Sequence, residues 1–179
     1  MFPGRASIIV LAALIQGLVQ AAPATGQPLQ STLEYSVKAN YLVRFAAFVE
    51  WPAQSFASAR APVVLCIAGR DPFEGALERA ARDQTAHGRP LAVRRPATVE
   101  AAAGCHILYV GRGGGGVVPA GDPAILVVTD AAATASRGMV HFVIAENRVR
   151  FHIDLQAASR GRLSISSRLL NLALSVRGG

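Results

Sequence analysis

The chain is 179 residues long and carries a formal net charge of +7, from 18 Lys and Arg side chains against 11 Asp and Glu. This charge does not indicate a nucleic-acid partner, because the basic residues are scattered and are not interleaved with aromatic side chains that could stack on bases. The length fits one domain with a sizeable core, and the sequence shows no repeat, no heptad series and no second long apolar span.

Residues 1–24 have the features of a secretory signal peptide. Arg5 precedes a short apolar segment over residues 6–19, and small residues allow cleavage after Ala21 or after Ala24. The segment is shorter than the roughly 20 residues that cross a bilayer, and no cysteine stands directly after it to carry a lipid. We therefore expect an exported, periplasmic protein whose mature domain covers residues 25–179, in a compartment where disulfides persist.

Apolar patterning predicts alternating strands and helices over most of the chain. A helix is expected over residues 33–49, where apolar side chains recur at helical spacing before Trp51-Pro52 ends it. Short apolar runs predict strands over 63–68, 90–94, 107–110 and 124–129. Between the first two strands, Asp71-Pro72 predicts a helix start with Asp71 as the N-cap, running to about Arg82. This order predicts a largely parallel sheet covered on both faces.

The last part of the chain changes to an alternating pattern. Residues 139–145 and 148–155 predict an antiparallel hairpin that places His141 opposite His152. One face is expected in the core and the other in solvent; the core face carries Val140, Phe142, Ile144, Val149, Phe151, Ile153 and Leu155. Ser166 then caps a final helix with an apolar stripe at Leu169, Leu170, Ala173 and Leu174. The predicted fold is a single α/β domain, a mixed and mostly parallel sheet flanked by helices, with this hairpin and helix at its C-terminal end.

The two cysteines are candidates for a structural disulfide. Cys66 lies inside the first predicted strand, and Cys105 precedes the third. In a sheet ordered 2-1-3 these two strands are neighbours, so a bridge between them is geometrically reasonable. A redox-active pair is the alternative, although the spacing is not Cys-x-x-Cys.

The ends of the predicted parallel strands carry arginines. Gly69-Arg70-Asp71, Gly111-Arg112 and Thr129-Asp130 follow three strands and should cluster at a switch point, where open sheets bind ligands. A small anionic ligand held by Arg70 or Arg112 is therefore possible on the predicted topology, and Asp130 is expected to cap a short alanine-rich turn. Residues 111–116 also match G-x-G-x-x-G, but no helix is predicted after them, so a flexible surface loop is favoured over a dinucleotide site.

Metal and catalytic sites receive little support. His141 and His152, with Asp154 two residues further on, could ligate a divalent metal. Without a third histidine or a thiolate nearby, a solvated cross-strand pair is favoured and no metal is expected. No serine lies in a G-x-S-x-G elbow, and no nucleophile stands with a base. The sequence therefore predicts no enzyme and no cofactor.

Two motifs resemble those of the YfiR family of periplasmic proteins. Residues 38–42 (KANYL), Phe45 and residues 48–52 (FVEWP) resemble the family's opening motif. Residues 148–155 (RVRFHIDL) and 163–170 (LSISSRLL) resemble its closing motif, and the resemblance spans about residues 34–176. Cys66 and Cys105 match the positions of a disulfide seen in the family. Two departures are the missing cysteines for a second disulfide near the last hairpin and the glycines at 113–116, where relatives commonly have a short helix.

The resemblance implies a regulator without catalytic residues. Family members repress a membrane-bound diguanylate cyclase by contacting its periplasmic sensor region, which limits cyclic di-GMP and biofilm formation. In some systems an outer-membrane lipoprotein sequesters the repressor. The implied fold is a mixed α/β sheet with flanking helices, often as a homodimer. The alternative interpretation is a periplasmic module that binds a small ligand through the arginines at the strand ends.

Overall fold

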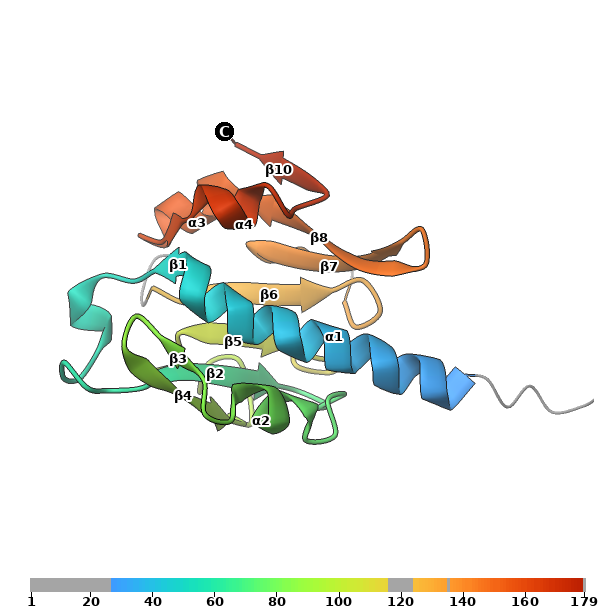
Figure 1. The fold of residues 1–179 in the computed structure, drawn as a ribbon, viewed down its shortest axis with the longest axis horizontal. Coiled ribbons are helices and arrows are strands. Elements are labelled where there is room, and N and C mark those ends of the chain that lie inside the picture. The colour runs from blue at the N-terminus through green and yellow to red at the C-terminus, as the bar shows by residue number, and fades with distance from the viewer. Residues whose placement is uncertain (1–26, 116–123, 135, 179) are drawn as a thin grey trace, which may run out of the picture.

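A mixed sheet runs through the centre of the molecule (Figure 1). The structure is a computed structural model that describes residues 27–115, 124–134 and 136–178, so the predicted signal peptide and its cleavage sites lie outside the described residues. Within them, eight strands pair in the order β10-β8-β7-β6-β5-β2-β4-β3. These strands are β2 (Val63–Ala68), β3 (Thr85–Ala86), β4 (Arg89–Arg94), β5 (Ile107–Val110), β6 (Leu126–Asp130), β7 (Val140–Ala145), β8 (Arg148–Asp154) and β10 (Ser175–Arg177).

The remaining elements lie around this sheet. A separate antiparallel pair joins β1 (Val49–Glu50) to β9 (Ser164–Ile165). The helices are α1 (Gln27–Phe48), the 3-10 turn η1 (Ala53–Ser55), α2 (Ala76–Ala81), α3 (Leu155–Arg160) and α4 (Ser167–Leu170). The helix α1 therefore begins earlier than the predicted residue 33 and ends one residue before the predicted 49.

The parallel half confirms the predicted strand order. β2 lies between β4 and β5 and is parallel to both, and β6 is parallel to β5 and β7. The strands β5 and β6 are buried along their whole length, as expected for continuous apolar runs in a sheet covered on both faces.

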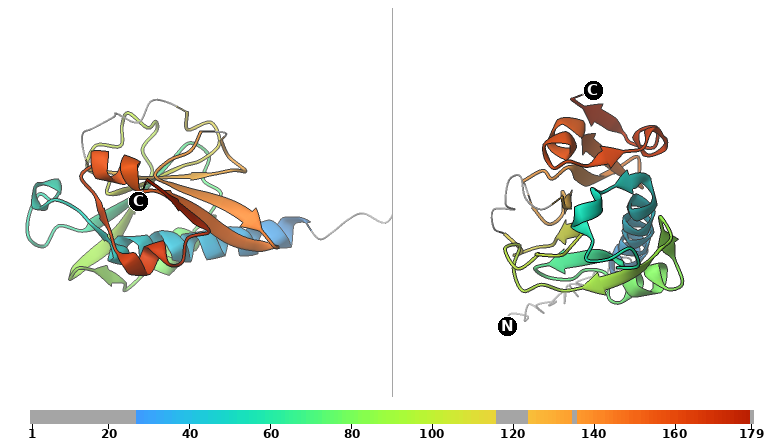
Figure 2. Two further views of the ribbon diagram at one scale, coloured as in Figure 1. Left: turned by 90° about the horizontal axis from the view of Figure 1, so that it is seen from above. Right: turned by 90° about the vertical axis from the view of Figure 1, so that its left-hand side faces the viewer.

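The two faces of the sheet are covered differently (Figure 2). The helix α1 packs along one face and contributes Phe45, whose ring lies 5.8 Å from that of Phe142 and 5.2 Å from that of Phe151. The opposite face is covered by the segment before β5, where Val99 and Ala102 join a smaller buried cluster around the cysteines.

The predicted helix start at Asp71-Pro72 is wrong. The Asp71 carboxylate accepts a hydrogen bond from the Phe73 amide at 2.7 Å and closes a turn instead. Glu74 and Gly75 then have φ values of 49° and 79°, a left-handed conformation that no α-helix contains. The helix α2 consequently begins at Ala76 and is only six residues long.

The hairpin register is confirmed, but its division into a core face and a solvent face is partly wrong. His141 pairs with His152 as predicted. Ile144 is exposed because β6 pairs with β7 only as far as Phe142, so the hairpin tip extends beyond its neighbour. His141 is buried because this part of β7 lies inside the sheet, beside Thr129 of β6.

The C-terminal segment also departs from prediction. Asp154 ends β8 and caps α3 by accepting a hydrogen bond from the Ala157 amide at 2.8 Å, so Leu155 is helical. Ser166 caps the last helix, accepting from Arg168 at 3.2 Å, but α4 ends at Leu170. The chain then enters β10, which pairs parallel to β8, and this leaves Leu174 of the predicted stripe exposed.

Candidate functional site

The loops after β2 and β5 interlock at the carboxyl ends of the parallel strands. The Arg70 amide donates a hydrogen bond to the Arg112 carbonyl at 2.9 Å. A Cβ at Gly111 would lie 2.3 Å from the Arg70 carbonyl oxygen, and one at Gly69 would lie 2.4 Å from the Gly114 nitrogen. Glycine is therefore required for the loops to approach so closely. Within the described part of the glycine-rich motif, Gly111 and Gly114 are packed in this way, whereas Gly113 and Gly115 have open space around them and lie at the surface, as expected for a surface loop; residue 116 lies outside the described residues.

A cavity of about 190 Å³ opens beside these loops, on the side covered by α1. It brings together the two arginines that the sequence singled out as ligand-binding candidates. The lining residues are Tyr35, Arg70, Pro72, Tyr109, Arg112, Ala132 and Ala133. Arg112 donates one hydrogen bond to the Ala132 carbonyl at 3.1 Å, so its guanidinium is tied to the turn that follows β6.

A buried ion cluster lies behind the tyrosines of this cavity. Lys38 is the only lysine in the chain, and its side chain is buried. Its ammonium donates to Asp130 Oδ2 at 2.5 Å and to Glu34 Oε1, and it lies 4.6 Å from the centre of the Tyr35 ring. The Tyr109 hydroxyl donates to the same Asp130 oxygen at 3.1 Å. One cation thus balances part of the charge of two carboxylates.

Sequence reasoning missed this cluster. The sequence singles out Lys38 only as part of a family motif, and Asp130 as a strand-end residue and the cap of a turn, a role it also has through the Ala132 amide at 2.9 Å. The available signal was the position of Lys38 one and two helical turns before Leu42 and Phe45, on the apolar face of the predicted helix. A lone charge on such a face requires a buried partner.

Burial keeps the two tyrosines in their protonated form. It raises the pKa of Tyr109 well above its usual range, and the nearby Asp130 charge raises it further. Burial, followed by the Asp130 charge, also raises the pKa of Tyr35, which is hydrogen-bonded to Tyr109. Protonated phenols and guanidinium groups bind oxygen-bearing ligands, whereas neither is an activated nucleophile.

The hairpin histidines have hydroxyl partners on neighbouring strands. His141 Nδ1 lies 2.8 Å from Thr129 Oγ1, and burial lowers the pKa of His141. His152 Nδ1 lies 2.6 Å from Ser175 Oγ. Asp154 accepts from the Arg177 guanidinium and caps α3. Across residues 27–115, 124–134 and 136–178, no three His, Cys, Asp or Glu side chains converge in a way that could hold a metal.

The predicted disulfide is confirmed. Cys66 and Cys105 are bonded with their Cα atoms 5.9 Å apart, and both are buried in the smaller core cluster. Thiol exchange requires access of an attacking thiolate to a sulfur, so this burial favours the structural role over the redox-active alternative.

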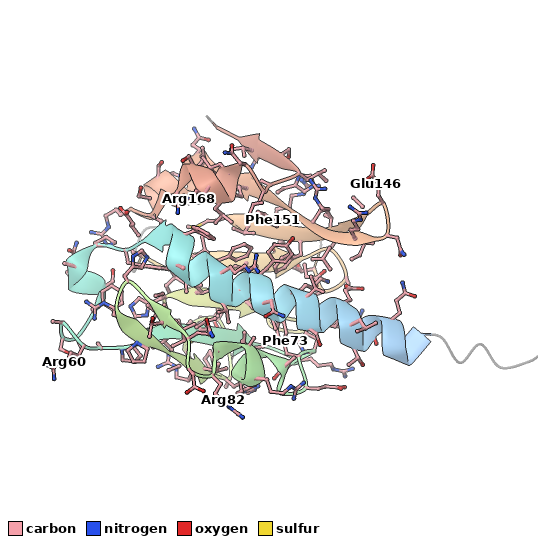
Figure 3. All side chains as sticks on the ribbon, viewed as in Figure 1. Arg60, Phe73, Arg82, Glu146, Phe151 and Arg168 are labelled. Carbon is pink, nitrogen blue, oxygen red and sulfur yellow. A yellow bond between two sulfur atoms is a disulfide. The ribbon has the colours of Figure 1, made fainter. Side chains whose placement is uncertain are left out.

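An apolar groove lies between the N-terminal half of α1 and the tip of the β7–β8 hairpin. Its volume is about 880 Å³, and Arg148 and Arg150 line it together with Glu34. Four large apolar side chains face solvent along it: Leu33 (70% exposed), Ile144 (51%), Leu172 (47%) and Val37 (43%). Figure 3 shows the hairpin, with Glu146 at its tip, extending alongside this half of the helix. Sequence patterning assigned Ile144 and Leu33 to buried faces and did not find the groove.

Comparison with known proteins shows to which family the chain is related. The model of the YfiR/HmsC-like family matches residues 35–174, and no curated protein matches at a significant level. None of the described helices combines the length and apolar composition needed to cross a membrane. The chain belongs to the YfiR/HmsC-like family, a family of periplasmic proteins that regulate diguanylate cyclase signalling and are not catalysts.

Proposed function

We propose that this protein is an exported repressor that binds the periplasmic sensor region of an inner-membrane diguanylate cyclase and lowers cyclic di-GMP. The proposal is supported by family membership and, within the described residues, by an open apolar groove of about 880 Å³ bordered by two arginines. An outer-membrane lipoprotein that sequesters the repressor and a second copy of the chain are further partners implied by the family resemblance.

The groove is the docking face in this proposal. Contiguous exposed apolar side chains on a monomer commonly mark interaction sites, and arginine is frequent among the residues that dominate binding energy. Arg148 and Arg150 at the border favour a partner segment that is apolar along one side and acidic beside it. Repression requires the domain to prefer the inactive cyclase; a hundredfold preference corresponds to about 2.8 kcal/mol.

Cyclic di-GMP in the host tests the proposal. Deletion of the gene should raise the cyclic di-GMP level. The exported wild-type protein should return that level to normal, whereas a version without residues 1–24 should not. The double variant Leu33→Asp/Ile144→Asp should fail to repress, because two charges enter an apolar interface. Val176→Asp is the matched control, since Val176 is also exposed but lies on β10, outside the groove.

Two results would contradict the proposal. An unchanged nucleotide level in the deletion strain would remove the repressor function itself. Full repression by the double variant, present in the periplasm at the wild-type amount, would leave the function standing but exclude the groove as the docking face.

A second candidate function is a small-ligand-binding module. The observation that favours it is the cavity of about 190 Å³ between Arg70 and Arg112.

A further inference from the structure

We propose that the cavity between the ends of β2, β5 and β6 is a receptor site for a compact ligand with a single oxyanion group, a carboxylate or a phosphate. The site is separate from the groove, and its existence does not depend on the partner proposed above. Its position is at the switch point of the sheet, because the chain passes from β2 to β4 on one side and then to β5 on the other. Open α/β sheets bind ligands outside the carboxyl ends of the strands at this point.

Arg70 and Arg112 both retain hydrogen-bond donors for an oxyanion. They stand on different loops, but the hydrogen bond between the Arg70 amide and the Arg112 carbonyl fixes the loops to one another. The Arg70 side chain makes no hydrogen bond or ion pair with another described residue. Arg112 uses one of its N–H groups on Ala132. A guanidinium has five such donors in a planar fork, so both side chains retain donors that match a carboxylate or phosphate.

The floor of the cavity limits the charge of the ligand. The hydroxyl groups of Tyr35 and Tyr109 are neutral, but Tyr109 donates to Asp130, whose carboxylate shares the Lys38 ammonium with Glu34. A second anionic group would be repelled on moving inward, whereas a single oxyanion stays on the side of the cavity lined by Arg70 and Arg112. The arrangement therefore favours a ligand with one oxyanion group, oriented with its anionic end toward Arg70 and Arg112.

The volume of the cavity limits the size of the ligand. At about 190 Å³, the cavity is smaller than the roughly 300 Å³ at which pockets for drug-sized molecules begin. Pro72, Ala132 and Ala133 supply apolar wall, so a short aliphatic or hydroxylated chain behind the oxyanion is accommodated.

Titration of the purified protein tests the site directly. The probes are propionate, lactate and inorganic phosphate, each followed by amide NMR shifts at constant ionic strength, with chloride as the reference salt. We expect saturable shifts at Gly69, Arg70, Gly111 and Gly113, with dissociation constants of about 10 mM or tighter. Saturation by propionate or lactate identifies a carboxylate site, and saturation by phosphate alone identifies a phosphate site.

Variants separate this site from general attraction to a basic surface. Arg70→Ala and Arg112→Ala should each weaken binding about tenfold or more, because each removes hydrogen bonds to a charged group. Arg60→Ala is the matched control: Arg60 is an exposed arginine on a distant loop (Figure 3) and does not line the cavity. An equal loss in all three variants, or no saturation by any probe, would overturn the proposal. Neither result depends on cyclic di-GMP, so failure here is distinguishable from failure of the repressor function.

Discussion

Lys38 lies in an environment that is unusual for a lysine, because its side chain is fully buried. Its ammonium lies in the core between Asp130, which is itself buried, and Glu34, which is half-buried. Removal of an ammonium from water is unfavourable unless close opposite charge compensates for it. The two carboxylates, with the Tyr35 ring 4.6 Å away, provide that compensation.

Replacement of Lys38 by methionine should destabilise the protein by about 3–5 kcal/mol, because it leaves Asp130 charged and buried without its cation. Urea unfolding of the two proteins measures the difference. Arg44→Met is the control, since Arg44 is an exposed cation on the same helix. The double variant Lys38→Met/Asp130→Asn should recover part of the loss. A Lys38→Met protein as stable as the control would show that the ion cluster does not hold α1 to the sheet.

His106 should make the fold sensitive to mild acid. Its Nδ1 accepts from the Val64 amide at 3.1 Å, and Nε2 faces the Ser55 carbonyl at 3.2 Å, so the folded state needs a neutral ring protonated on Nε2. Burial lowers the pKa of His106 below its usual 6.5. The unfolded chain therefore binds a proton first, and the stability due to this residue is complete above about pH 6.5 and is lost as pH falls toward the folded pKa.

NMR titration of the His106 ring, combined with urea unfolding between pH 7 and pH 5, checks this expectation. The ring should titrate below 6.5 in the folded protein, and the unfolding midpoint should fall over the same interval. His106→Asn should show a smaller fall, with the remainder due in part to His141, whose pKa burial also lowers. Titration of His106 at or above 6.5 would contradict the expectation.

At the scale of elements, the disulfide ties β2 to the start of β5. It closes a loop with a sequence separation of 39 residues, for which the chain-entropy model gives about 4 kcal/mol of stabilisation. Urea unfolding with and without reductant should show a loss of this order, and thiol titration of the unfolded, unreduced protein should find no free thiol. The variant Cys66→Ala/Cys105→Ala should not respond to reductant. Two free thiols in periplasmic protein would contradict the prediction.

Strands were predicted better than helices, for a physical reason. A buried strand is a continuous apolar run, and its ends in β2 and β5 match the run itself. Helix ends depend on single residues: the left-handed Glu74 and Gly75 delay α2, and the Asp154 carboxylate starts α3. The two-residue strands β1, β3 and β9 were not predicted, because two residues carry no periodicity.

At the scale of the whole molecule, the two candidate sites share one helix. Glu34 of α1 lines the groove, and the adjacent Tyr35 lines the cavity. Glu34 also accepts a hydrogen bond from Lys38, and the Lys38 ammonium donates to Asp130 beside the cavity. A chain of direct contacts therefore connects the strand ends to the face proposed for the cyclase.

The sites differ in how far sequence could predict them. Arg70 and Arg112 were brought together correctly because the strand order follows from alternation of strands and helices. The groove depends instead on how far the hairpin extends beyond β6 and on where residues 171–172 lie after α4. Those are long-range packing outcomes that local periodicity does not encode. The regulatory function came from the family motifs and not from either site.

The single buried lysine also determines how the protein behaves toward amine chemistry. In the folded domain no lysine ammonium is accessible to an acylating reagent, since the one in the chain is enclosed by α1 and the sheet. Amine-directed cross-linkers can therefore attach a bound partner only through the α-amino group. Guanidine- or carboxylate-directed reagents are needed to capture a partner elsewhere on the domain. Conversely, acylation of Lys38 requires its exposure, so the rate of that modification reports how readily α1 leaves the sheet.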